Sequence, residues 1–286
     1  MHFVLISVLC SVSVAVLLKY ARRKGLDTWQ MIVWNYPVAV CLTYFIFQPD
    51  FSAIPMLSLP WHLYIPVAVL LPALFMVLSH SLRYAGLVQT EVAQRLSLVL
   101  SLIAAAWLFH EVFSAVRIAG IIIGLMAVAC LIGWRRSQQQ VNQSRYILFP
   151  LVVFVGYGAI DILFKMVALQ PVIPYTTSMF LMFSGAMLLA LGYLAYQLSR
   201  KKLVLSGKAM GWGFALGFLN FGNILFYMKA HQALSDSPSV VFTGMNIGVI
   251  GLGALLGVWL FKEKLSTMNI IGIALAVVSV LMIAYL

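Results

Sequence analysis

Long apolar runs, separated only by short polar stretches, constrain this chain more than any other feature. The run "AGIIIGLMAVACLIGW" (residues 119–134) is an example. A transmembrane helix needs roughly 20 mostly apolar residues to cross about 30 Å of hydrocarbon. Ten segments meet this requirement, and they span residues 2–18, 30–47, 62–82, 88–109, 115–134, 146–169, 175–198, 209–231, 237–260 and 267–286.

The composition agrees with a chain dissolved in a bilayer. The 286 residues are 63% hydrophobic and only 9% charged, whereas about a quarter of the residues of a soluble domain carry charge. The uninterrupted runs do not show the alternating polarity of barrel strands. The sequence therefore predicts an all-α integral membrane protein with ten transmembrane helices and no sizeable soluble domain.

Lysine and arginine residues gather in alternate connections, namely those after the first, third, fifth, seventh and ninth segments. These connections hold Lys19, Arg22, Arg23, Lys24, Arg83, Arg135, Arg136, Arg145, Arg200, Lys201, Lys202, Lys208, Lys262 and Lys264. Short connections rich in these residues stay in the cytoplasm, so both termini are predicted to lie outside. The same placement, beside anionic lipid headgroups, explains the net charge of +11 without a nucleic-acid partner.

The chain also repeats itself. Residues 82–134 align without gaps with residues 234–286, and "WLFHEVFSAVRIAG" (107–120) lies opposite "WLFKEKLSTMNIIG" (259–272). We therefore divide the chain into a first five-helix repeat (1–134), a basic polar linker (135–145) and a second five-helix repeat (146–286). Because five is odd, the second repeat enters the membrane in the opposite sense, which is a common design of secondary transporters.

The duplicated "WLFHE" and "WLFKE" junctions, each followed by a glycine-bearing last helix, resemble those of the drug/metabolite transporter superfamily, and in particular its EamA-like ten-helix permeases. The resemblance covers essentially the whole chain. It implies a basket of helices around a central cavity, lined by the first, third and fourth helices of each repeat, with the fifth helix outside.

The same resemblance implies a function and a location. It points to export or exchange of a small polar metabolite, such as an amino acid, across the bacterial inner membrane. The expected protein is a monomer or homodimer that is not an enzyme and needs no cofactor or metal. Many members of this superfamily keep both termini in the cytoplasm, which is the reverse of the orientation that the charges predict.

Asp161 and Lys165 are an acid and a base inside an otherwise apolar stretch, "AIDILFKM" (159–166). A charge at membrane depth needs a partner or a wet cavity, and a spacing of four places both side chains on one helix face. They form either a self-neutralising pair or a cavity-facing pair that binds a charged or zwitterionic solute, with Asp161 as a possible proton site. Lys165 has a repeat counterpart in Lys19, whereas the counterpart of Asp161 is Ala15.

A second pair with the same spacing is formed by Glu91 and Arg95, with Gln94 beside them. It is either a salt bridge near the headgroups or part of a pocket for a solute with unlike ends. Three further positions are predicted pocket residues: Asn223, Tyr227 and Asn246. The alternative for these neutral side chains is hydrogen bonding between helices.

Two more patterns carry structural expectations. Glycines such as Gly120, Gly124, Gly244 and Gly248 are expected where helices pack closely. The repeated Glu111 and Glu263 follow the tryptophans at the helix junctions, where each carboxylate is expected to serve the N-terminal end of the next helix.

Two other classes of function are open to such a chain: a membrane enzyme, and a structural or receptor-like membrane protein, in which an inverted repeat has no obvious use. A membrane-embedded enzyme, or a flippase for lipid-linked groups, would act at the bilayer interface. Such an enzyme needs a cluster of His, Asp or Cys side chains near one interface, and the sequence shows none. Flux of a solute across a sealed membrane distinguishes the classes.

Overall fold

The computed structural model describes residues 1–49, 59–84, 87–132, 143–171, 173–201, 203–261 and 267–285. Within these ranges the chain is helical and contains no strand, so the predicted all-α fold is confirmed. The helices are α1 (His2–Arg23), α2 (Thr28–Phe47), α3 (Trp61–Tyr84), α4 (Leu87–Trp107), α5 (Ala115–Ile132), α6 (Gln143–Ala168), α7 (Tyr175–Ser199), α8 (Gly207–Ala233), α9 (Pro238–Phe261) and α10 (Thr267–Tyr285).

Five helices are long and apolar enough to cross a membrane, judged by length and composition. They provide the segments Thr28–Phe47, Trp61–Leu78, Leu148–Ala168, Tyr175–Ser199 and Gly207–Ala233. Each of the other five contains a shorter apolar helical stretch of 10–17 residues, counted over the described residues.

Two boundaries differ by three residues or more from those predicted. Helix α1 continues to Arg23, beyond the predicted end at residue 18, because "KYARR" contains good helix formers. It ends where Gly25 adopts a φ of 69° and Leu26 N donates to Ala21 O, a common helix C-terminus. Helix α6 begins at Gln143, so residues 143–145, assigned to the linker, are helical; the rest of the linker lies outside the described residues.

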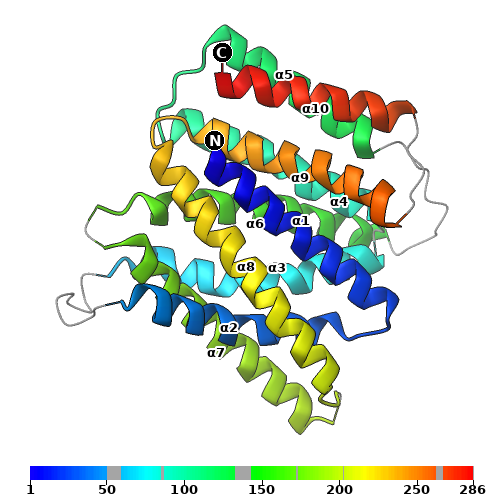
Figure 1. Ribbon diagram of the computed structural model, residues 1–286. Helices are drawn as coiled ribbons and strands as arrows, with labels where there is room; N and C mark the ends of the chain where they lie inside the picture. The colour runs from blue at the N-terminus through cyan, green and yellow to red at the C-terminus, as the bar shows by residue number, and fades with distance from the viewer. Residues whose placement is uncertain are drawn as a thin grey trace.

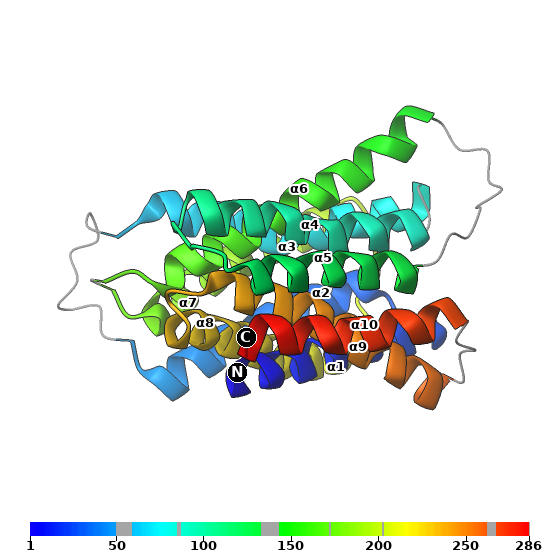
Figure 2. The same ribbon diagram turned by 90° about the horizontal axis from the view of Figure 1, so that it is seen from above.

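The helix contacts occur in pairs that agree with the repeat predicted from the sequence. Helix α1 packs against α8 and α9, and its counterpart α6 packs against α3 and α4. Likewise α2 packs against α8, and α7 packs against α3. Equivalent helices also meet each other in the pairs α2 with α7, α4 with α9, and α5 with α10. Helices α5 and α10 lie side by side at one edge of the bundle (Figures 1 and 2).

Helices α2 and α8 approach closely because α8 carries glycines on the contact face. A Cβ atom added to Gly217 would lie 2.8 Å from the backbone oxygen of Asn35, and one added to Gly213 would lie 2.8 Å from that of Met31. Beside this contact, Asn220 Nδ2 donates to Asn35 Oδ1 over 2.9 Å. Small residues and buried amides are the expected means of joining helices in an apolar medium.

The glycine packing predicted for α5 and α9 is found at three positions. A Cβ atom would contact Ile247 at Gly124, Val4 at Gly244 and Val8 at Gly248, at distances of 2.6, 3.1 and 2.8 Å. Gly251 and Gly253, further along α9, have no such neighbour within 4 Å. Helix α9 therefore packs closely on α1 through its N-terminal half.

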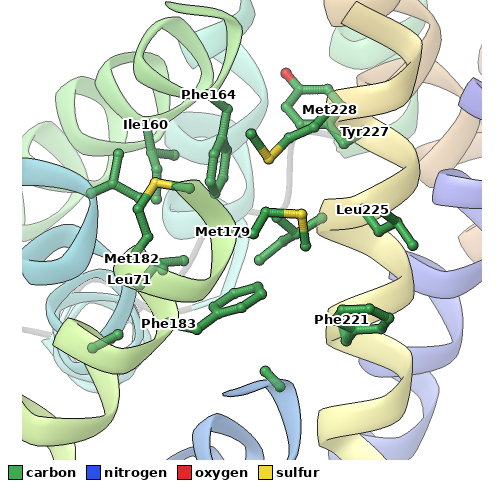
Figure 3. Close-up of a cluster of buried hydrophobic side chains, with 14 of the residues drawn as sticks. Leu71, Ile160, Phe164, Met179, Met182, Phe183, Phe221, Leu225, Tyr227 and Met228 are labelled. Carbon is green, nitrogen blue, oxygen red and sulfur yellow. The ribbon is translucent and has the colours of Figure 1, made fainter. Parts of the chain in front are cut away.

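One part of the core lies where α7 faces α6 and α8 (Figure 3). Met179, Met182 and Phe183 of α7 are fully buried. They meet Phe164 from α6 and Met228 from α8 in one continuous cluster. This packing fixes α6 and α8 relative to each other, and these two helices carry most of the polar residues that line the cavity described below.

Candidate functional site

A cavity of about 180 Å³ lies inside the bundle, between α1, α3, α4, α6, α8 and α9. These are the first, third and fourth helices of the two repeats, the set that the family resemblance implies. Among the described residues, none from α2, α5, α7 or α10 lines it. The lining residues are Ser11, Leu71, Leu74, Phe75, Gln94, Ser97, Tyr157, Ile160, Asp161, Phe164, Asn220, Asn223, Ile224, Tyr227, Met245, Asn246 and Val249.

Asp161 is held in this cavity by hydroxyl groups from two other helices. Tyr227 of α8 donates to Oδ1 over 3.0 Å, and Ser101 of α4 donates to Oδ2 over 3.2 Å. Hydrogen bonds to an ionised carboxylate are stronger than those between neutral groups. The ring of Phe164 packs edge-on against Tyr227, with the ring centroids 6.1 Å apart. These contacts fix the direction of the only carboxylate among the described lining residues.

Amide side chains line the cavity together with this carboxylate. Ser7 Oγ lies 2.9 Å from Asn223 Oδ1, and Asn246 Nδ2 donates to Phe242 O over 3.0 Å. Within the described contacts, one end of each of these two amides bonds to the protein, and the other end offers a donor or an acceptor to the cavity. Gln94 lines the same cavity. Five of the predicted site residues therefore line one cavity: Gln94, Asp161, Asn223, Tyr227 and Asn246.

Lys165 is not among the lining residues. Its side chain is fully buried, Nζ donates to Ser235 O over 2.7 Å, and Nζ lies 5.6 Å from the centre of the Phe109 ring. The lysine therefore reaches the connection between α8 and α9 and is not brought to Asp161. Within the described contacts, the two residues form neither the self-neutralising pair nor the cavity-facing pair considered from the sequence.

Glu91 and Arg95 belong to the first turns of α4. Their side chains lie outside the described part of the structure, so their predicted role in the pocket remains a prediction.

Several lining residues were not predicted from the sequence. Tyr157 lies four positions before Asp161, so the i, i+4 rule for one helix face could have found it. Ser97 and Ser101 share a face of α4 by the same spacing, and Ser101 is a direct donor to Asp161. Nothing in the sequence of α1 distinguishes Ser11 from the neighbouring serines.

Glu111 departs from its predicted role. It was expected to serve the N-terminal end of the next helix, α5. Instead its carboxylate accepts a hydrogen bond of 2.8 Å from the backbone nitrogen of Ser239, in the first turn of α9, and another from the Ser239 hydroxyl. The carboxylate still meets the positive end of a helix dipole, but the helix belongs to the other repeat. Glu263 lies outside the described residues.

The fold and the cavity define a helical protein with a central, partly polar chamber. No family model matches the sequence. An uncharacterized protein of Haemophilus influenzae is 37% identical over 291 aligned positions, which cover 100% of this chain and 98% of that protein. The chain belongs to the same protein family as this relative. A crystal structure described only as that of a protein superposes with a TM-score of 0.71 at 16% identity, over 99% of this chain and 95% of that one, which supports the fold alone.

Proposed function

We propose that this protein is a secondary transporter, of the drug/metabolite type, that exports or exchanges a small polar metabolite such as an amino acid. In this proposal ten helices span the bacterial inner membrane as two inverted five-helix repeats. The cavity around Asp161 is the solute site, and the observation that carries the proposal is its position among the first, third and fourth helices of both repeats.

The outer surface supports insertion in a bilayer. Large apolar side chains point outward on many helices, including Leu9 of α1, Phe45 of α2 and Leu188 of α7, which are 54%, 72% and 69% exposed. Trp107 and Trp259, equivalent residues of the two repeats, are 84% and 77% exposed near the ends of α4 and α9. Exposed tryptophan at helix ends is typical of the interface between membrane and water.

The paired helix contacts support two inverted repeats. The N- and C-termini also lie close together in both views of the ribbon, as expected for an even number of spans (Figures 1 and 2). The basic connections α1–α2 and α7–α8 lie at the same end of the bundle. Gln30 Nε2, at the start of α2, donates to Val204 O in the α7–α8 connection over 2.9 Å, and Lys24 Nζ lies 5.7 Å from the centre of the Trp212 ring in α8. We assign this basic side to the cytoplasm.

The chemistry of the cavity supports a small solute with polar and apolar parts. One water molecule needs about 10–15 Å³ of such volume, so a cavity of about 180 Å³ accommodates a solute of amino-acid size. Asp161 would attract an ammonium or another hydrogen-bond donor, and Asn223 and Asn246 would bind further polar groups. Leu71, Ile224 and the other apolar lining residues suit a hydrocarbon part.

In the proposed cycle the two repeats rock against each other, so that the cavity opens to one side of the membrane at a time. Proton coupling through Asp161, exchange of two solutes, or the solute gradient alone would drive the cycle. The test is reconstitution of the purified protein in sealed proteoliposomes and measurement of flux across a panel of amino acids and other small metabolites. A leak-tight preparation that moves no member of a broad panel would overturn the proposal.

A further inference from the structure

We propose that a polar cluster, with the buried Glu111, Lys165 and Ser239 at its centre, closes the cavity at the side where α4, α6 and α8 end, and that this cluster must separate when the cavity opens there. The cluster, called the polar closure below, consists of Glu111, Arg117, Lys165, Ser235, Ser237 and Ser239. The inference rests on the proposed function, because only a transporter needs to open this side.

Glu111 joins the first repeat to the second. It lies in the connection between α4 and α5, and its carboxylate accepts hydrogen bonds from the backbone N–H and the hydroxyl of Ser239 in α9. Arg117 of α5 adds a salt bridge of 3.3 Å to Glu111 and donates to Ser237 Oγ, also over 3.3 Å. The glutamate is only 8% exposed. The beginning of α9 is therefore attached to the α4–α5 connection by charge-assisted hydrogen bonds.

Lys165 joins the end of α6 to the same place. Its hydrogen bond to Ser235 O attaches α6 to the connection between α8 and α9, and Gln232 Nε2 of α8 donates to Ala168 O over 3.0 Å. Hydrogen bonds thus connect the end of α6 to the end of α8. The carboxylate of Glu111 bonds to the start of α9 in the same region. Helices α4, α6, α8 and α9, whose ends meet in this region, also line the cavity.

The closure lies next to the cavity along two helices. On α6, Lys165 follows Asp161 by four residues, and on α8, His231 follows Tyr227 by four, so each step is about one helical turn, roughly 5–6 Å. The fully buried His231 ring fills this level, with centroids 4.7 Å from Tyr227 and 4.9 Å from Phe242. A solute leaving the cavity in this direction would therefore have to pass between Lys165, His231 and Glu111.

The charged and polar composition of the polar closure suits a cluster that separates when the cavity opens. Buried ionic groups contribute little net stability over an apolar contact of the same shape, because removing them from water is costly. In an open state, water would hydrate the ammonium of Lys165 and the carboxylate of Glu111. This hydration would offset much of the free energy lost with their hydrogen bonds. Apolar side chains in the same place would gain no such hydration when they separated. Two states of similar free energy are the requirement for alternating access.

The test measures access of water to the cavity from the closure side and needs no solute. Cys10, Cys41 and Cys130 are first replaced by serine or alanine, and Ser11→Cys then provides one thiol in the cavity. A membrane-impermeant maleimide is added to each face of sealed vesicles. A separate variant, Val112→Cys, marks the closure side, because Val112 is 88% exposed in the α4–α5 connection.

We expect slow labelling of Ser11→Cys from the closure side in the parent. Adding Glu111→Gln, or Lys165→Met, should raise that rate roughly tenfold, since each removes one contact that favours the closed state. Lys208→Met removes an exposed lysine at the start of α8 and is the matched control with an unchanged rate. Gel filtration and thermal unfolding verify that the variants are folded.

Unchanged labelling in folded Glu111→Gln and Lys165→Met proteins would overturn the inference, as would fast labelling of the parent from the closure side. These outcomes are distinct from a failure of the proposed function, which would appear as absence of solute flux whatever the labelling pattern.

Discussion

The hydroxyl of Tyr227 donates a 3.0 Å hydrogen bond to Oδ1 of Asp161, and this contact joins the first and third helices of the second repeat inside the cavity. Tyr227 is 6% exposed, so the bond is shielded from bulk water. Asp161 has no acidic counterpart in the first repeat, where Ala15 occupies the equivalent position. The cavity is therefore asymmetric, although the helices around it come in equivalent positions from the two repeats that the sequence predicts.

Tyr227→Phe removes this bond and keeps the ring. Hydrogen bonds to charged groups contribute about 1.5–3 kcal/mol, so we expect solute affinity to fall by roughly tenfold or more. Tyr193→Phe is the matched control, because the Tyr193 hydroxyl accepts from Gln197 on the same helix, α7, away from the cavity. The affinities are obtained from concentration-dependent flux in proteoliposomes. Equal affinities for the two variants would show that the Tyr227 hydroxyl does not contribute to solute binding.

Two glycines of α8 should respond in opposite directions to the same substitution. Gly211→Ala should stabilise the protein by up to about 1 kcal/mol, since alanine is the better helix former and nothing lies within 4 Å of its new Cβ. Gly217→Ala should destabilise it by roughly 1–3 kcal/mol, because that Cβ meets the Asn35 backbone and Val38. Thermal unfolding in detergent measures both, and a stabilising Gly217→Ala would contradict the close approach of α2 and α8.

The turn after α1 depends on a left-handed backbone. Gly25 has a φ of 69° with no atom within 4 Å of an added Cβ, so Gly25→Ala should cost about 1 kcal/mol through conformation alone. Gly25→Asn should cost less, because asparagine tolerates this region. If thermal unfolding ranks alanine at or above asparagine, the turn does not have the conformation described.

The amides of Asn35 and Asn220 should be energetically coupled. Their 2.9 Å hydrogen bond joins α2 to α8, and such bonds between membrane helices average about 0.6 kcal/mol in double-mutant cycles. We expect the two alanine substitutions together to cost less than the sum of the single costs, by about that amount. Strict additivity in unfolding experiments would show that the amides act independently.

The helical architecture could be predicted because it depends on local patterns. A run such as residues 119–134 is long enough for one transmembrane helix and lacks the alternating polarity of a barrel strand. The positions of the helices follow from the short polar gaps between such runs. The ends were less predictable: the extension of α1 to Arg23 depends on helix propensity and on Gly25, and both effects are small beside the hydrophobic signal.

Partners distant in sequence could not be predicted. The spacing of Asp161 and Lys165 correctly places them on neighbouring turns of one helix. The long lysine side chain lies near the helix end, however, and bonds to an acceptor outside that helix. That acceptor, Ser235 O, is 70 residues away along the chain. Glu111 likewise finds Ser239, across 128 residues and in the other repeat. Neither contact leaves a pattern in the sequence.

Flux of a transported metabolite through Asp161→Asn protein tests the central claim most directly. Wild-type protein, Asp161→Asn and the matched control Asp27→Asn are reconstituted at equal density; Asp27 caps α2 at Trp29 N, a role that asparagine can fill. The account predicts flux by the wild type and by Asp27→Asn, and a loss of roughly tenfold or more in folded Asp161→Asn, since a charged ligand group is lost. Wild-type flux by Asp161→Asn would contradict it.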